Sequence, residues 1–338
     1  MKTLSVVILN WNGLHLLRTY LPQVVANTPA DVADIVVADN ASTDGSLDYV
    51  RQTFPQVGII AFDRNHGFAG GYNRALQGIG TPLTVLLNSD AAPDPGWTEP
   101  LLRLFDAEPD VAAAAPKILS YTRPDLFEYA GAAGGFVDWL GYPFCRGRIM
   151  DTVEADRGQY DTDIDAFWAS GAALAVRTPI YRQLGGLDED FFAHMEEIDL
   201  CWRMLNAGFR VVACGHASVR HLGGGTLSQQ NPHKTYLNFR NNLLMLVKNY
   251  NTRLWPAVIA IRLVLDGLAG LRFAATGHWA DCRAIVLAHW HFFARLRATM
   301  AKRRHLAAGR SRHLPDTMKR YSVMWRYFAR RRTVYSDI

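Results

Sequence analysis

Residues 4–12 read Leu-Ser-Val-Val-Ile-Leu-Asn-Trp-Asn, a short apolar run rich in β-branched residues that ends in polar ones. Such a run is typical of a strand buried on both faces. After it, leucine and valine recur at helical spacing over residues 14–25. The alternation continues, with strands expected at 35–38, 58–62, 83–87 and 111–115 and helices at 46–54, 68–79 and 97–105. Alternating strands and helices predict an α/β fold with a mostly parallel sheet covered on both faces.

Polar residues follow each of the first four expected strands. They are Asn10 and Asn12, Asp39 to Asp44, Arg64 to Gly67, and Asn88 to Asp90. Each cluster alone fits turn and capping chemistry. Because open α/β sheets bind ligands beyond the carboxyl ends of their strands, four such clusters in succession predict one shared pocket.

The 338 residues carry a net charge of +5 that is very unevenly distributed. From Asn251 onward there are 17 basic and 4 acidic residues, a net +13, whereas the first 250 residues carry 19 basic and 27 acidic ones, a net −8. The basic part is expected to attract phosphates, of lipid or of nucleic acid.

Four widely spaced cysteines and the start of the chain bear on the compartment. Cys145, Cys201, Cys214 and Cys282 show no metal-ligand or redox spacing, which favours a reducing environment. Met1 leads directly into the first strand without a secretory pattern, so we expect a cytoplasmic protein.

The second half of the chain is mainly helical in pattern. Residues 120–164 are rich in glycine and aromatic residues with weak periodicity, and we expect a long excursion that orders on ligand binding. A strand is expected at 167–176, a turn and helix at 184–208, and a helix at 232–250.

The apolar run at 254–276 contains Arg262, Asp266 and Arg272, which are costly in hydrocarbon. It therefore predicts an interfacial helix or a buried amphipathic one. The remainder mixes tryptophan, phenylalanine and tyrosine with many arginines, a combination that suits an anionic membrane surface, with a solvated basic tail as the alternative.

Two groups of carboxylates are candidates for chemistry. Asp90 follows an apolar strand and Asn88, so it could hold Mg²⁺ or Mn²⁺ together with diphosphate oxygens, although a turn aspartate is the alternative. Glu196, Glu197 and Asp199 place three carboxylates within four residues, where mutual repulsion should raise at least one pKa toward that of a general base. A helix start, which favours acidic residues, explains the same three residues without catalysis.

Two further motifs lie downstream. His221 precedes three glycines, which let backbone approach a ligand closely, and as a neutral imidazole it could complete a metal shell. Arg240 lies one helical turn after Tyr236 and could clamp a phosphate, unless it is only a surface arginine. The chain has no Gly-x-Gly-x-x-Gly after its first strand and no Gly-Lys-Ser/Thr, against a dinucleotide dehydrogenase and a P-loop NTPase.

Taken together, these motifs resemble those of family 2 glycosyltransferases with a GT-A fold, most of all the bacterial rhamnosyltransferase-like branch. The matching stretches are 5–12, 37–44, 65–73, 87–90, 185–203 and His221, which span roughly residues 3–245. The resemblance implies a GT-A-type mixed, mostly parallel sheet with flanking helices, followed by a helical basic C-terminal region.

The resemblance also assigns roles to residues. Asn10, Asn12 and Asp39 would hold base and ribose, and Asn65, Gly70, Gly71 and Asn73 would shape the nucleotide pocket. Asn88-Ser89-Asp90 matches an Asp-x-Asp motif whose first aspartate is replaced. Asp90 and His221 would bind the divalent metal, and Arg240 would face the diphosphate. Glu197 would be the base, with Glu196 and Asp199 as alternates.

The implied activity is inverting transfer of a sugar, best L-rhamnose from dTDP-rhamnose, to a saccharide acceptor that is polyprenyl-linked, in cell-surface polysaccharide synthesis. Galactofuranose, glucose or another hexose is the alternative. The competing class is a non-catalytic sugar-nucleotide-fold module whose tail binds nucleic acid or membrane. For the transferase we expect no nucleic acid partner and a peripheral location on the inner face of the cell membrane.

We expect a glycosyltransferase domain over 1–250, divided into a nucleotide-binding half (1–116) and an acceptor and metal half (117–250). A membrane-associating helical region would then occupy 251–338.

Overall fold

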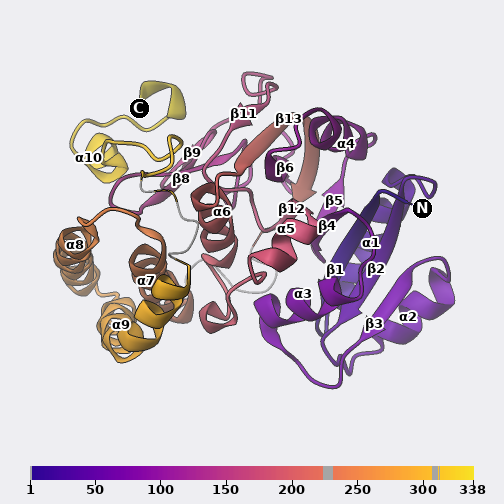
Figure 1. The fold of residues 1–338 in the computed structure, drawn as a ribbon, viewed down its shortest axis with the longest axis horizontal. Coiled ribbons are helices and arrows are strands. Elements are labelled where there is room, and N and C mark those ends of the chain that lie inside the picture. Colours follow the sequence, from indigo (N-terminus) through magenta and orange to yellow (C-terminus); the bar gives the residue numbers. More distant parts are fainter. Residues whose placement is uncertain (1, 224–230, 307–310, 312) are drawn as a thin grey trace.

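The computed structural model describes residues 2–223, 231–306, 311 and 313–338. Its centre is a nine-stranded sheet with the order β11-β13-β6-β12-β4-β1-β2-β3, and β5 pairs with β13 beside this path (Figure 1). The strands are β1 (Leu4–Asn10), β2 (Ala33–Asp39), β3 (Gly58–Ala61), β4 (Leu83–Asn88), β5 (Ala91–Pro93), β6 (Val111–Ser120), β11 (Ile164–Asp165), β12 (Ala173–Arg177) and β13 (Arg210–His221).

The sheet is mixed and mostly parallel, as the sequence predicts. β1 runs parallel to β2 and β4, β2 to β3, and β6 to β13, whereas β12 is antiparallel between β4 and β6. The helices of this part are α1 (Leu14–Asn27), α2 (Ser46–Thr53), α3 (Gly67–Gln77), α4 (Thr98–Ala107), α5 (Thr178–Gln183) and α6 (Glu196–Asn206).

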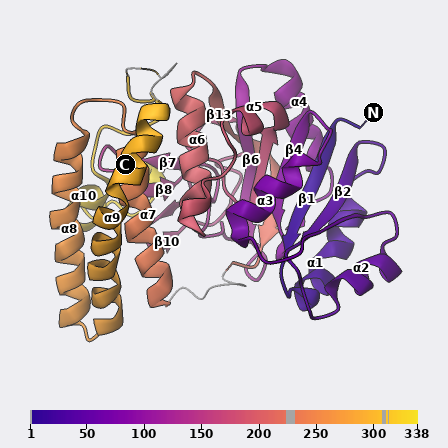
Figure 2. The same cartoon turned by 60° about the horizontal axis from the view of Figure 1, so that its bottom comes forward.

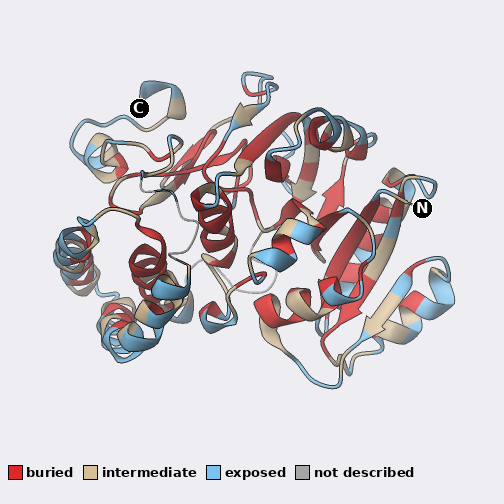
Figure 3. Cartoon of the chain, viewed as in Figure 1, coloured by how far each residue is buried: buried red, intermediate tan, exposed pale blue. Residues whose placement is uncertain are grey.

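The central strands are apolar throughout because both faces of the sheet are covered. Val7 and Leu86 belong to one buried cluster, while their neighbours Val6 and Val85 belong to the cluster on the opposite face. Successive side chains of a strand point to opposite faces, so a two-sided core requires a continuous apolar run. Figure 3 shows these strands as the most deeply buried part of the chain.

Residues 120–164 do not form the predicted excursion. They contain a second, four-stranded sheet made of β7 (Gly135–Val137), β8 (Pro143–Cys145), β9 (Arg148–Ile149) and β10 (Thr152–Val153). Strands of two or three residues are too short to leave a periodic pattern in the sequence. Gly147, at φ +101°, makes the turn between β8 and β9 over the ring of Phe127.

The strand expected at 167–176 is also shorter than predicted. It begins only at Ala173, because the Ser170 hydroxyl bonds the carbonyl of Ala130 and accepts the N–H of Ala172, which holds 170–172 in a turn. This turn becomes a wall of the candidate site.

The C-terminal region packs against the sheet domain through its helices. These are α7 (Pro232–Asn249), α8 (Trp255–Ala275), α9 (Trp279–His305) and α10 (Val323–Phe328), with α7, α8 and α9 side by side at the end of the molecule away from β1 to β3 (Figures 1 and 2). One buried cluster joins Val7 of the sheet to Leu244 of α7 and Phe292 of α9. The domain division at residue 250 stays a prediction. In the described part of the chain, every helix is too short or too polar to cross a membrane.

Candidate active site

Asp90 and His221 lie side by side at the carboxyl ends of their strands. Asp90 stands in the turn between β4 and β5, and β13 pairs with β5 up to its last residue, His221. His221 Nε2 is 3.0 Å from Asp90 Oδ1 and 3.2 Å from Asn88 Nδ2. The structure thus brings the predicted residues Asn88 and Asp90 together with His221, which lies more than 130 positions later in the sequence.

A third acidic side chain stands behind the histidine. Glu128 Oε2 lies 3.5 Å from His221 Nδ1 and also accepts the N–H of Ala130. Burial opposes the charged imidazole, but the carboxylates of Asp90 and Glu128 outweigh it and raise the pKa of His221 to about 10. Glu128 was not predicted from the sequence, because it is a lone acid in a stretch without periodicity.

The donor set fits a divalent cation that keeps substrate oxygens in its shell. Asp90 and His221 offer one oxygen and one nitrogen, and Glu128 stands where an outer carboxylate orients a ligating imidazole. Among the described residues, no group of three or more histidine, cysteine or acidic side chains could hold a metal ion alone. Of the three glycines after His221, Gly223 is described, whereas 224 and 225 lie outside the described residues.

Glu197 reaches the same end of the sheet from helix α6. A Cβ placed on Gly171 would lie 3.6 Å from Glu197 Cγ, so this side chain lies against the 170–172 turn. The next carbonyl, of Ala172, accepts the N–H of Asn88 at 3.0 Å. Through this turn, Glu197 is a near neighbour of the β4 end that carries Asn88 and Asp90.

Burial makes both Glu196 and Glu197 weaker acids than a glutamate in water. It raises the pKa of Glu197 to about 7 and that of Glu196 well above its ordinary value, to which the charge of Glu197 adds. One oxygen of Glu196 is buried without a hydrogen-bond partner in the described structure. A carboxyl with a pKa near neutrality suits proton transfer at physiological pH.

Asp199, the third carboxylate of the motif, faces the interior. Its oxygens accept from Arg203 Nε at 2.9 Å, Lys248 Nζ at 2.8 Å and Asn249 Nδ2 at 2.7 Å, and the residue is fully buried. These contacts join α6 to α7 and leave Asp199 no access to an acceptor.

The loop before Glu196 is held by α7. Asn241 Nδ2 donates to the carbonyls of Phe191, Ala193 and His194, and Arg240 Nη2 donates to Phe191 at 3.0 Å. The Arg240 guanidinium also stacks on the Tyr236 ring. The structure thus gives Arg240 backbone partners in this loop, where the sequence predicted a phosphate.

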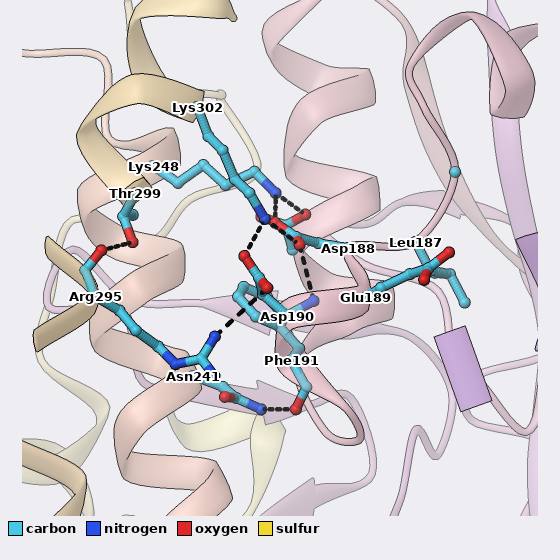
Figure 4. A network of polar contacts seen from close by, with 12 residues as sticks. Leu187, Asp188, Glu189, Asp190, Phe191, Asn241, Lys248, Arg295, Thr299 and Lys302 are labelled. Atoms are coloured by element: carbon cyan, nitrogen blue, oxygen red, sulfur yellow. Dashed lines mark hydrogen bonds and ion pairs between the residues drawn. The ribbon is translucent and has the colours of Figure 1, made fainter. Parts of the chain in front are cut away.

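Helix α9 holds the same loop from its other side (Figure 4). Lys302 Nζ contacts carboxylate oxygens of Asp188 and Asp190, both at 2.5 Å, and Arg295 pairs with Asp190 at 3.4 Å. Although burial alone would raise it, the charges of Lys248 and Lys302 hold the pKa of Asp188 well below its usual range. The C-terminal region therefore helps to position the loop that leads into Glu197.

On the donor side, the loops after β1 and β2 are locked to each other. Asp39 Oδ1 accepts from Asn10 Nδ2 at 2.8 Å and from the Ser42 hydroxyl at 2.6 Å. Asn12 Oδ1 accepts the N–H of Thr43 at 2.8 Å. The three predicted residues Asn10, Asn12 and Asp39 are thus brought together. Trp11, between the two asparagines, is 55% exposed and offers a free aromatic face.

The other predicted donor residues shape the backbone nearby. Asn65 Oδ1 accepts the N–H of Gly67 in the turn before α3. A Cβ on Gly71 would lie 2.6 Å from Leu9 Cδ1, so α3 packs closely on β1, and Gly70 lies against Arg74 and Glu189. Asn73 clasps the backbone of Leu187, donating to its carbonyl at 2.8 Å and accepting its N–H at 2.9 Å. The structure places Asn73 against the loop before α6, outside the loops that follow β1 and β2.

Solved structures with the same architecture are glycosyltransferases. GalNAc-T7 with UDP, GalNAc and Mn²⁺ matches with a TM-score of 0.57 and 18% identity over 73% of this chain and 48% of that chain. Mannosyltransferase PcManGT from Pyrobaculum calidifontis, in complex with GDP-Man and Mn²⁺, matches with a TM-score of 0.53 and 16% identity over 91% of this chain and 86% of that chain. At such identities the likeness concerns the fold alone.

Sequence relatives point to the same class. An N-acetylglucosaminyl-diphospho-decaprenol L-rhamnosyltransferase from Mycobacterium tuberculosis is 29% identical over 227 residues, 62% of this chain and 72% of that protein. The low-salt glycan biosynthesis hexosyltransferase Agl10 from Haloferax volcanii is 22% identical over 247 residues, 71% of this chain and 74% of that protein. Residues 5–130 match the family model described as glycosyl transferase family 2.

The fold, the site and these relatives define an enzyme, a glycosyltransferase of the GT-A type. Within that class, residues 5–130 match the model of glycosyltransferase family 2, and the sequence relatives support that family.

Proposed function

We propose that this enzyme transfers L-rhamnose from dTDP-rhamnose, with inversion, to a polyprenyl-linked saccharide in cell-surface polysaccharide synthesis. The observation that carries the proposal is the cluster of Asp90, His221 and Glu128 beside the turn against which Glu197 lies. The sugar and the lipid carrier follow the relative from Mycobacterium tuberculosis, whose name gives a rhamnosyl transfer and a decaprenol-linked acceptor.

Asp90 and His221 would hold Mg²⁺ or Mn²⁺, which supplies positive charge to the departing diphosphate when it is bound. Glu128 orients the imidazole from behind. The buried Asn10–Asp39–Ser42 network fixes the loops that face base and ribose, and Asn12 holds the second loop through Thr43. The exposed ring of Trp11 is suited to stack on a base.

Glu197 accepts the proton of the acceptor hydroxyl as its oxygen attacks the anomeric carbon. The bond from that carbon to the diphosphate breaks as the new glycosidic bond forms, so the configuration inverts and no covalent enzyme intermediate is needed. In this scheme, Asp199, Arg240 and Asn241 position the catalytic loop, because their polar atoms are occupied within the protein.

Two cations favour an anionic acceptor. Arg148 is buried and lies over the Tyr129 ring, and its Nε has no hydrogen-bond partner among the described residues. Burial lowers the pKa of Lys234, and the charges of Glu128 and Arg148 act on it in opposite directions. A lipid-linked acceptor with a diphosphate would meet them there, and we propose that the enzyme works peripherally on the inner face of the cell membrane, where such an acceptor is found.

A second candidate donor is another hexose nucleotide, which the Haloferax volcanii hexosyltransferase favours. The test is transfer to a synthetic polyprenyl-diphosphate N-acetylglucosamine from dTDP-rhamnose, UDP-galactofuranose, UDP-glucose and GDP-mannose. We expect product from dTDP-rhamnose alone, with inverted anomeric configuration by NMR, and none from the Glu197→Gln variant. Product from a hexose donor would redirect the sugar assignment, and undiminished transfer by the variant would overturn the mechanism.

A further inference from the structure

Helix α8 buries two charged side chains on its inner side and exposes a row of apolar side chains on its outer side. Arg262 and Asp266 are buried and pair with each other at 3.3 Å, and Arg262 Nη1 also donates to the Leu140 carbonyl at 2.8 Å. The apolar residues Ile261, Val264, Leu268 and Leu271 are 39–67% exposed and recur at helical spacing. A helix facing water shows the opposite arrangement, so another apolar phase is expected to cover this side.

Helix α9 continues the apolar surface. Trp279, Val286, Trp290 and Phe293 are 55–73% exposed and also fall on one stripe of the helix. The two helices touch, since a Cβ on Gly270 of α8 would lie 3.8 Å from Cys282 and Ile285 of α9. We call these eight residues the outer face of α8 and α9. It lies at the end of the molecule away from the N-terminal strands (Figure 2).

The charges around the outer face indicate which kind of partner binds to it. Arg272, Arg283, Arg297 and Arg304 are exposed and have no carboxylate within ion-pair distance in the described part of the chain. Tryptophan and arginine on an apolar helix face suit the headgroup region of an anionic bilayer. A second copy of the chain would oppose arginine with arginine, which disfavours self-association through this face.

Helix α9, which carries half of the outer face, is fastened to the first turn of α7. Thr235 in the first turn of α7 donates to Asp281 of α9 at 2.6 Å, and the Tyr236 hydroxyl meets His291 at 2.8 Å. Lys234 lies in the same turn of α7. The first half of α9, with Trp279 and Trp290, is thus fastened to the first turn of α7.

We propose that the outer face of α8 and α9 seats the enzyme on an anionic phospholipid bilayer, lying on it without crossing it. Its apolar side chains enter the headgroup boundary and the arginines contact lipid phosphates. Binding through the outer face brings the first turn of α7 to the bilayer, and a lipid-linked acceptor enters the enzyme there. This last step rests on the proposed function, whereas the binding surface does not.

Vesicle flotation tests the surface directly. The full-length protein is mixed with vesicles of phosphatidylcholine alone or of phosphatidylcholine with anionic phosphatidylglycerol. We expect binding to the anionic vesicles only. The triple variant Leu268→Ser, Trp290→Ser and Phe293→Ser should bind at least roughly tenfold more weakly. Arg283→Gln with Arg297→Gln should weaken binding by a similar factor, roughly tenfold, and make the remaining binding less sensitive to salt.

The matched control is Arg51→Gln with Arg103→Gln, two exposed arginines on α2 and α4 that should leave binding unchanged. Transfer to a water-soluble acceptor without vesicles is measured in parallel and should survive in all variants. Loss of that transfer with intact flotation would count against the proposed function and leave the surface standing. Equal flotation of wild type and both outer-face variants, or a wild type that dimerises through this face and ignores anionic vesicles, would overturn the inference.

Discussion

Replacing Glu197 by glutamine should abolish turnover and at the same time stabilise the folded protein at alkaline pH. Glutamine keeps the shape of the side chain but cannot ionise. In the folded enzyme, burial raises the pKa of Glu197 from its ordinary 4.5 to about 7. The folded state therefore binds more protons than the unfolded state between these two pH values, and the free energy of unfolding falls as pH rises through this window.

The magnitude follows from the displaced pKa. Each tenfold change in a protonation equilibrium is worth about 1.4 kcal/mol, so the full displacement costs at most about 3 kcal/mol above pH 7. Because part of the side chain still meets solvent, we expect a gain of about 1 to 3 kcal/mol for Glu197→Gln at pH 8. At pH 4 both forms are neutral and the gain should vanish. Removing the charge also relieves Glu196, whose pKa it helps to raise.

Urea unfolding of wild type and Glu197→Gln at pH 4 and pH 8, with a chelator present, measures this difference. Glu99→Gln on α4 is the matched control, since Glu99 is exposed and far from the site, and its effect should be small at both pH values. Donor binding by the Glu197→Gln variant should survive while transfer is lost. A variant no more stable than wild type at pH 8, or a stability gain equal at both pH values, would refute the assigned environment of Glu197.

Four other changes probe the surroundings of the site. Asp199→Asn leaves Arg203 and Lys248 without the buried charge they share, and it should lower the free energy of unfolding by about 2 to 4 kcal/mol in denaturant titrations; an unchanged midpoint would contradict the structural role. Lys302→Met removes the contacts of α9 with Asp188 and Asp190, so we expect the free energy of unfolding to fall by about 1 to 2 kcal/mol and kcat to decrease. Unchanged stability and kcat would show that the loop needs no support from α9. Glu128→Gln should weaken Mn²⁺ binding roughly 10- to 100-fold by calorimetry, and unchanged affinity would dismiss Glu128 as an outer carboxylate. Gly147→Ala, at φ +101° and with its new Cβ 2.8 Å from the Phe127 ring, should cost roughly 2 to 3 kcal/mol, whereas a neutral effect would mean that the β8–β9 turn relaxes freely.

The sheet could be predicted from the sequence because its strands are buried on both faces. The apolar runs at 4–9 and 83–87, each followed by polar residues, have the pattern of buried strands that end in ligand-binding loops. Asp90 and His221 could be placed in one site by motif and resemblance, and their atoms are 3.0 Å apart in the structure.

Other features depend on contacts between distant segments and left little trace in the sequence. The second sheet is built from strands of two and three residues, and Glu128 acquires its meaning only from His221, 93 positions later. The contacts of Arg240 with the Phe191 carbonyl and the Tyr236 hydroxyl could not be foreseen from the sequence, and its phosphate role stays a prediction. Which face of α8 is buried could not be predicted, because helical spacing separates a polar from an apolar face without showing which one lies inside.

The central claim is that Asp90 and His221 act as one site for a cation bound with a diphosphate. Calorimetric titration of dTDP, with and without Mn²⁺, into wild type, Asp90→Asn, His221→Ala and the double variant tests it most directly, with Glu197→Gln as the control. We expect Mn²⁺-dependent binding in wild type and Glu197→Gln, its loss in either single variant, and little further loss in the double variant. Mn²⁺-dependent binding that persists in Asp90→Asn, or independent and additive losses, would contradict it.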